Sequence, residues 1–374
     1  KVQKALKEIK TKSASKQDME TAKSEFREEI SNAMTPNTLV HLAGYGDVSY
    51  DSKAGNDGSF NRVNFSPIFH YQYKDLFMLE AELEFQVQAD GETDVEMEYL
   101  SIDWFMNDYA TLVAGKFLSS IGQFRQNLHP SWINKMVDAP PGFGHDGAAP
   151  VSDVGLQVRG GFGEKIRSNY AVYIANGPEL NVAAEGGEFE LEGIMAEGFN
   201  TDVDGNKTFG GRYGIIPMVG LEIGLSAATG KAAVTNIVDE EAGTSMSVLG
   251  DSRSYDVLGA DFAWQRKTLD FRGEYVKTKI GEALTGPGAS EGASWKTWYL
   301  QAAYMIPSVS LEPVLRYTDF DAPGTTGDVK QWSAGLNYHF TNHLLAKLNY
   351  QSNDVNKGSH IPENKWLVQL AYGF

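Results

Sequence analysis

Charged side chains recur at every second position of several apolar segments, a spacing that suits the wall of a polar passage. Successive side chains of a strand point to opposite faces, so each such segment has one apolar and one charged face. If Val154, Leu156 and Val158 face lipid, the same parity turns the charged residues inward. The expected basic lining is Lys116, Arg159, Arg212, Arg272, Arg316 and Lys347, and the expected acidic lining is Glu80, Glu82, Glu84, Asp261, Asp270, Glu274 and Glu312. Walls of opposite charge would orient dipolar or charged solutes. The alternative is that these charges only solvate the interior and pair with one another.

The longest connection between two expected strands, residues 119–152, carries a second group of polar residues. It contains Arg125, His129 and Lys135 among several prolines and aromatic residues. Long loops in compact folds usually have a function. We expect this loop to fold inward and form a constriction that faces the basic wall. The alternative is an ordinary outer loop that packs on the rim.

Other chemistry is not supported by the sequence. Cysteine is absent, which excludes disulfides, thiolate metal sites and thiol catalysis. His129 and His145 lack metal-ligand spacing, and residues 202–206 fit an Asp-Gly turn as well as an incomplete calcium loop. No Gly-x-Ser-x-Gly element or supported Ser-His or Asp-His constellation is found. We therefore expect no enzyme activity and no cofactor.

The net charge excludes one class of partner but does not define the passage. Lys+Arg is 32 and Asp+Glu is 49, so the net charge is −17, which argues against a nucleic-acid binder. The connections 177–206 and 230–252 contribute −8 and −3 of this charge. Most of the excess charge therefore lies outside the expected lining and does not establish cation selectivity.

Alternating apolar and polar residues from Val40 onward predict the elements that position these side chains. Sixteen strands are expected, an even number that suits a closed antiparallel barrel. Their spans are 39–50, 60–73, 76–88, 94–105, 109–118, 153–162, 168–176, 207–216, 219–229, 253–266, 268–280, 294–305, 308–320, 328–340, 343–354 and 364–374. Tight turns alternate with longer connections, and aromatic residues recur at the strand ends, as in barrels with membrane-interface girdles. The fold class is thus all-β, a sixteen-stranded transmembrane barrel over residues 36–374.

Residues 1–35 differ from the barrel in composition and period. They are rich in Lys, Glu and Ser, and their apolar residues fall at helical steps in a narrow stripe. An even strand number puts both termini on the periplasmic side. We expect a periplasmic helix that forms a coiled coil with copies of itself; the alternatives are a frayed leader or a plug in the lumen.

Several segments resemble known outer-membrane proteins. Trp366–Phe374, with alternating aromatics and a terminal Phe, resembles the last strand of Gram-negative outer-membrane barrels. Gly115-Lys116-Phe117, the run from Tyr173 to Pro178, and Leu311-Glu312-Pro313 resemble the phosphate-selective porin O/P superfamily and the DcaP-like porins. This resemblance implies a trimer and, as several members have one, a helical N-terminal extension. No lysine ladder of the phosphate-specific type can be matched, so phosphate selectivity is not implied.

Together these features predict a homotrimeric porin of the Gram-negative outer membrane, surrounded by lipid. It would pass small polar or charged solutes by passive diffusion. A weak preference for anions such as dicarboxylates is expected from the resemblance and from the inward arginines. The alternative function is a plugged or structural barrel that tethers the N-terminal helix to peptidoglycan or another partner.

Overall fold

The computed structural model describes residues 38–53, 57–145, 147–185, 188–239, 244–289, 292–324, 328–357 and 364–374. The helix and coiled coil expected in residues 1–35 lie outside these described residues. Among the described residues, no helix has the length and apolar run needed to cross a bilayer.

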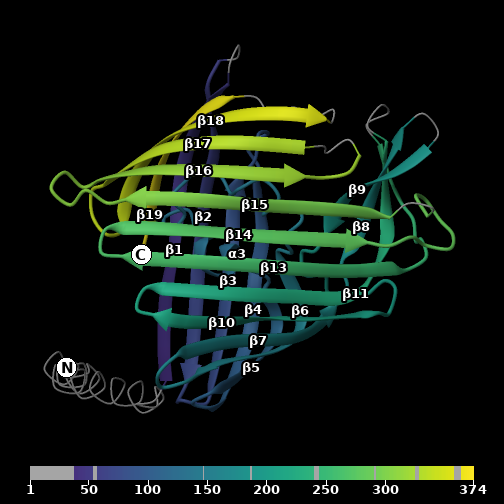
Figure 1. Cartoon of the computed structure of the whole chain (residues 1–374), viewed down its shortest axis with the longest axis horizontal. Helices are drawn as coiled ribbons and strands as arrows, with labels where there is room; N and C mark the ends of the chain where they lie inside the picture. Colours follow the sequence, from purple (N-terminus) through teal and green to yellow (C-terminus); the bar gives the residue numbers. More distant parts are fainter. Residues whose placement is uncertain are drawn as a thin grey trace, which may run out of the picture.

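Sixteen antiparallel strands form one closed barrel (Figure 1). They are β1 (Thr38–Lys53), β2 (Ser59–Tyr73), β3 (Phe77–Val87), β4 (Thr93–Asn107), β5 (Ala110–Leu118), β6 (Ser152–Phe162), β7 (Arg167–Asn176), β10 (Lys207–Met218), β11 (Leu221–Asp239), β13 (Arg253–Arg266), β14 (Leu269–Ile280), β15 (Ala293–Tyr304), β16 (Leu311–Asp321), β17 (Asp328–His339), β18 (Leu344–Lys357) and β19 (Lys365–Gly373). The first and last strands pair from Tyr45 opposite Gly373 to Lys53 opposite Lys365. Gly44 and Phe374 then exchange two backbone hydrogen bonds at 3.0 and 2.9 Å. The barrel therefore has no open seam along this pairing.

The alternation of side chains follows the predicted pattern. Polar inward residues such as Asn349 and Thr278 are fully buried, whereas large apolar side chains are exposed on the outer face. Outward aromatic rings pair at two levels, Tyr338 with Phe340 near the short turns and Tyr317 with Trp332 farther toward the long loops. An apolar outer face with aromatic girdles is the expected surface of a barrel in lipid.

Three further strands were not predicted. In the connections expected to be external loops, β8 (Glu179–Glu185) and β9 (Glu188–Met195) form a hairpin, and β12 (Thr244–Ser247) is a short strand. The barrel strand β11 extends beyond the rim and pairs with β8 on one side and β12 on the other. This small sheet lies at the long-loop end of the barrel, and its apolar side chains Leu180, Val182 and Leu191 are buried.

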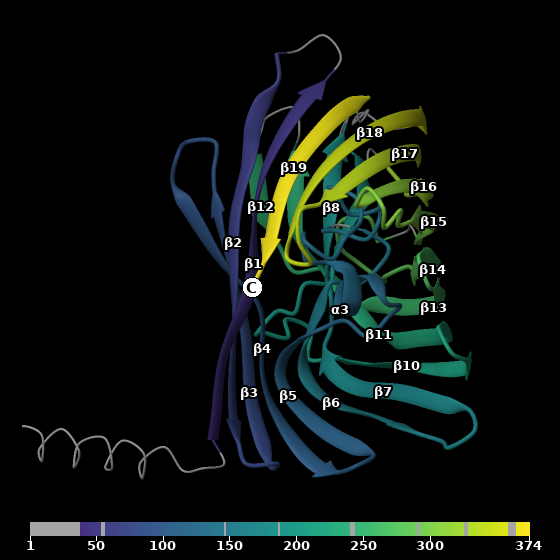
Figure 2. The same cartoon turned by 90° about the vertical axis from the view of Figure 1, so that its left-hand side faces the viewer.

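Residues 119–152 fold into the barrel and carry its only described α-helix, α3 (Phe124–Leu128). Figure 2 shows α3 inside the ring, between the wall of β1–β4 and the wall of β10–β16. The loop therefore lies between these two walls. The loop divides the lumen, and the side to which it is fixed decides which charged residues remain open.

Candidate functional site

Backbone groups of loop 119–152 are bound by the β11 and β14 wall. Glu274 on β14 accepts the N–H groups of Gln123 and Phe124 at 3.1 and 3.0 Å, where α3 begins. The hydroxyl of Ser226 on β11 accepts the N–H of Gly122 at 3.3 Å. A buried carboxylate that accepts two N–H groups satisfies donors that the short helix leaves free at its start.

Arg316 on β16 and Lys347 on β18 donate hydrogen bonds to the backbone of the second half of the loop, within residues 131–139. Arg316 Nη2 donates to the carbonyl oxygens of Asp138 and Ala139 at 3.0 and 3.3 Å. Lys347 Nζ donates to the carbonyl oxygens of Ser131 and, at 3.2 Å, Met136.

Both cations face inward as predicted, but they do not border open space. Arg316 and Lys347 are each only 1% exposed. Their predicted place in the pore lining is therefore corrected, because the loop covers them and its carbonyl groups use their N–H donors. They are positioning residues for the constriction.

Apolar packing closes the same side of the lumen. Phe124 and Phe143 of the loop pack on Tyr299 of β15, with ring centroids 6.3 and 5.2 Å from it. The buried cluster continues from these rings to Leu180 and Leu191 of the β8–β9 hairpin. Around these rings, the lumen beside β11–β17 is thus filled by side chains of the loop, the hairpin and the wall.

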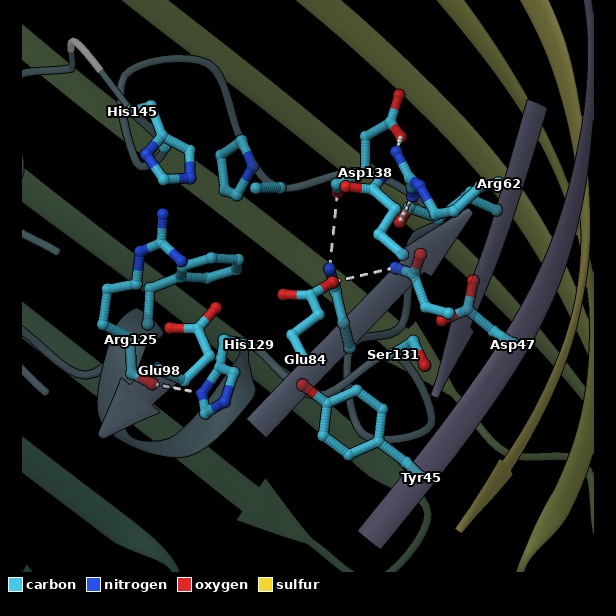
Figure 3. A pocket seen from close by; sticks show the side chains of 18 of the residues that line it. Tyr45, Asp47, Arg62, Glu84, Glu98, Arg125, His129, Ser131, Asp138 and His145 are labelled. Atoms are coloured by element: carbon cyan, nitrogen blue, oxygen red, sulfur yellow. Dashed lines mark hydrogen bonds and ion pairs between the residues drawn. The ribbon is translucent and has the colours of Figure 1, made fainter. Parts of the chain in front are cut away.

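An open cavity of about 590 Å³ remains between the loop and the wall of β1–β4. Figure 3 shows Arg125, His129 and His145 on its loop side, facing Glu84 and Glu98 on its strand side. Its charged lining is Asp47, Arg62, Glu84, Asp94, Glu96, Glu98, Arg125, Asp138 and Lys365. Burial lowers the pKa of the Arg125 guanidinium, and Glu98 is the carboxylate that acts most strongly in the opposite direction.

One acidic group in this lining is already neutralised. Asp138 of the loop lies 2.9 Å from Lys365 Nζ and 3.3 Å from Arg62 Nη2. Burial by itself would raise the pKa of the Asp138 carboxyl, but these two cations hold it below its usual value. The cluster joins loop, β2 and β19, and fixes the loop where it meets the open side.

Three side chains lie between this cavity and a second one. The Tyr45 hydroxyl donates to Glu82 Oε1 at 2.7 Å, and His129 Nε2 lies 3.5 Å from the same oxygen. The second cavity, of about 290 Å³, continues toward the short turns, lined by Glu80, Glu82, His129 and Arg159 among others. His129 borders both cavities. Of the residues proposed from the sequence, Arg125, His129, Glu82 and Arg159 thus line these two neighbouring cavities.

The remaining predicted residues lie elsewhere. Lys135 pairs with Glu312 at 2.5 Å, Arg212 pairs with Asp261 at 2.6 Å, and Arg272 pairs with Asp270 through Nε at 2.7 Å. Lys135 and Arg272 line a separate space of about 420 Å³ beside β10–β14, on the turn side of the loop. These charges are paired within the wall rather than set against the acidic side.

Lys116 is on the opposite face from the one predicted. It lies opposite Leu100 on β4 and Val154 on β6, so it shares the outward face. The inward residues of this strand are Val113 and Phe117, both buried. The prediction was wrong because it required every strand charge to face inward. Lys116 stands two residues from the strand end, where a long side chain can reach a polar surface.

Several contributors to the cavity were missed from the sequence, Tyr45 and Arg62 among them. Tyr45 and Arg62 belong to β1 and β2, whose inward residues were not assigned. The signal was present, since Tyr45, Asp47 and Ser49 alternate with outward residues and all three are buried. The possible calcium loop is a turn in which Asp204 Oδ1 accepts the N–H of Asn206 at 2.8 Å. The described part of the chain has no group of three or more His, Asp or Glu residues arranged to hold a metal ion.

Comparison with known proteins agrees with this architecture. Residues 221–365 match the family model described as phosphate-selective porin O and P. No curated protein matches the sequence. Among solved structures, the chain is similar to an anion-selective porin from Comamonas acidovorans (TM-score 0.57, 12% identity), with 90% of this chain and 100% of that chain covered.

Two further structures share the fold. The trimer form of OmpT from Vibrio cholerae has a TM-score of 0.56 at 13% identity, with 90% and 99% of the two chains covered. The outer membrane channel DcaP of Acinetobacter baumannii has a TM-score of 0.55 at 11% identity, with 90% and 98% covered. The family match over residues 221–365 and the closed sixteen-stranded barrel both support a porin-type fold.

Proposed function

We propose that this outer-membrane porin passes small polar solutes by passive diffusion and favours cations and zwitterions over dianions. The observation that carries the proposal is the charge of the open cavity. The lining has six carboxyl groups and three side-chain cations, a formal net charge of −3. Apart from Asp138, which contacts both Arg62 and Lys365, five carboxylates lie with one guanidinium, that of Arg125. The five carboxylates are those of Asp47, Glu84, Asp94, Glu96 and Glu98.

The arrangement supports orientation of dipolar solutes. Arg125 is on the loop, and Glu84 and Glu98 are on strands β3 and β4 across the cavity (Figure 3). A solute that carries both charges can satisfy both sides at once, whereas a dianion meets repulsion from the strands. Lining charges set ion preference when they act in a confined passage.

The reversal potential of the trimer in a planar bilayer under a salt gradient tests this proposal. We expect a cation-selective sign. Arg125→Ala should increase the cation preference, and Glu98→Gln should decrease it. Lys165→Ala, a change in an exposed turn between β6 and β7, serves as the control. An anion-selective sign would overturn the proposal and favour the dicarboxylate preference expected from the resemblance.

The alternative of a plugged or structural barrel is supported by the Tyr45–Glu82–His129 contact, which lies between the two cavities. Folded, inserted protein that never conducts would favour this alternative. Tyr45→Phe removes the hydroxyl that donates to Glu82. If that variant conducts while the parent chain is silent, the contact is a closed gate rather than part of a permanent plug.

We further propose a homotrimer whose residues 1–35 form a periplasmic coiled coil. Support comes from the helical period of these residues and from the trimer form of the similar OmpT structure. Native mass measurement of the full chain and of a chain without residues 1–34 tests this. A channel should conduct in either form, with a less stable trimer after truncation. A pull-down with peptidoglycan tests whether the segment contacts the cell wall.

A further inference from the structure

Two histidines face each other across β1 and β2 at the short-turn end of the lumen. His41 and His70 are directly opposite in the strand register. Their rings are stacked with centroids 5.6 Å apart and an interplanar angle of 21°, and their Nδ1 atoms are 3.3 Å apart. His41 shares the inward parity of Tyr45 and Asp47, so the pair faces the lumen.

A carboxylate determines which nitrogen of His70 is free. Glu80, opposite His70 on β3, places Oε1 3.0 Å from Nε2 of His70. When Nε2–H donates to this carboxylate, the neutral imidazole carries its lone pair on Nδ1. This Nδ1 lies 3.3 Å from Nδ1 of His41. A carboxylate behind a histidine is the usual arrangement that orients a metal-binding imidazole.

We propose that His41 and His70 bind a divalent transition-metal cation such as Zn²⁺ through their Nδ1 atoms, and that Glu80 positions the His70 ring. Two Zn–N bonds of about 2.0–2.1 Å that meet at a tetrahedral angle hold their nitrogens about 3.3–3.4 Å apart. The observed 3.3 Å separation meets this requirement without movement of either strand. Water completes the coordination, since the described residues offer no third protein ligand there.

The position of the pair connects binding to conduction. Glu80 and Ile68, the residue two before His70 on the same face, line the 290 Å³ cavity on the turn side of the constriction. A cation held at His41 and His70 therefore lies beside the solute path where it leaves the barrel. We expect the bound ion to repel permeating cations and reduce their current.

Zinc titration tests the site by binding and by conduction. Isothermal titration calorimetry of the folded trimer in detergent, with ZnCl₂ as titrant, should give one site per chain. His41→Gln or His70→Gln should weaken zinc binding at least about tenfold. Glu80→Gln should weaken it by a similar factor, because the carboxylate that orients the His70 ring is lost. In a bilayer, zinc added on the turn side should reduce the current at lower concentration than zinc on the long-loop side, reversibly with a chelator.

His343→Gln is the matched control, because His343 is exposed in a turn at the same end of the barrel. It should leave the zinc titration unchanged. Equal zinc affinity in the parent and in both His41→Gln and His70→Gln would overturn the proposal and leave the 3.3 Å contact as an imidazole–imidazole hydrogen bond. The calorimetry does not depend on conduction, so a silent channel would contradict the proposed function without affecting this result.

Discussion

Replacement of Lys347 by methionine distinguishes a residue that fixes the loop from one that lines the pore. Methionine has a similar length and no charge, so it fills the site but removes the donors to Ser131 and Met136. A buried acceptor left without a partner costs about 1–3 kcal/mol. Leaving two such carbonyl oxygens without donors costs roughly 2–6 kcal/mol. We expect a net cost of about 2–4 kcal/mol, because methionine removes the penalty of burying the lysine charge. Since 1.4 kcal/mol is a factor of ten, the detached loop should become about 30- to 700-fold more populated.

Single-channel recording and thermal unfolding measure this effect. We expect noisy current with sublevels and a lower melting temperature in Lys347→Met, with Lys165→Met, a substitution in an exposed turn, as the matched control. A lysine that lined open lumen would behave differently. Its loss would shift the reversal potential toward cations while the current stayed steady and the melting temperature unchanged. That result would refute the conclusion that Lys347 acts by fixing the loop through hydrogen bonds to its carbonyl oxygens.

Two further predictions concern the long-loop end. Leu191→Ala should destabilise the β8–β9 hairpin by about 2–5 kcal/mol, since the side chain is 2% exposed, and differential scanning calorimetry should show it. The 2.5 Å contact of His145 with Glu197 raises the pKa of His145, through the hydrogen bond first, and the same hydrogen bond lowers the pKa of Glu197. The stability that protonated His145 gives to this contact is complete below about pH 6.5 and is lost as pH rises through its raised pKa. The stability that ionised Glu197 gives is complete above about pH 4.3 and is lost as pH falls through its lowered pKa. Loop-dependent current noise should thus be lowest between these values, and Glu197→Gln should remove the pH dependence.

The barrel was accessible from sequence because its signal is repeated in every strand. One apolar and one polar face per strand, with short and long connections in alternation, follow from lipid on one side and a polar interior on the other. The β8–β9 hairpin was missed although its signal was present. Residues 179–185 and 188–195 alternate about Gly186-Gly187, a hairpin pattern, but they lie within the connection 177–206, which was predicted to be one of the longer external loops.

The site was less accessible because parity predicts the face of a side chain but not what covers that face. Arg316 and Arg159 both point inward, yet the loop buries the first and leaves the second at a cavity. That difference depends on the path of loop 119–152 across the lumen, which is set by contacts between residues far apart in the chain. Glu274 and Gln123 are one such pair, and no local pattern in the sequence relates them.

The path of the loop also explains why the open passage is acidic while basic residues are numerous inside the barrel. A loop that crosses the lumen presents backbone carbonyl oxygens to the wall it packs on, and buried carbonyl groups require donors. Arg316 and Lys347 supply those donors to carbonyl oxygens of the loop. The cations of the wall that binds the loop, Arg316 and Lys347, are therefore buried and do not line the open passage. The opposite wall, with Glu84 and Glu98, remains open, so the choice of packing side determines both the width of the passage and the sign of its charge.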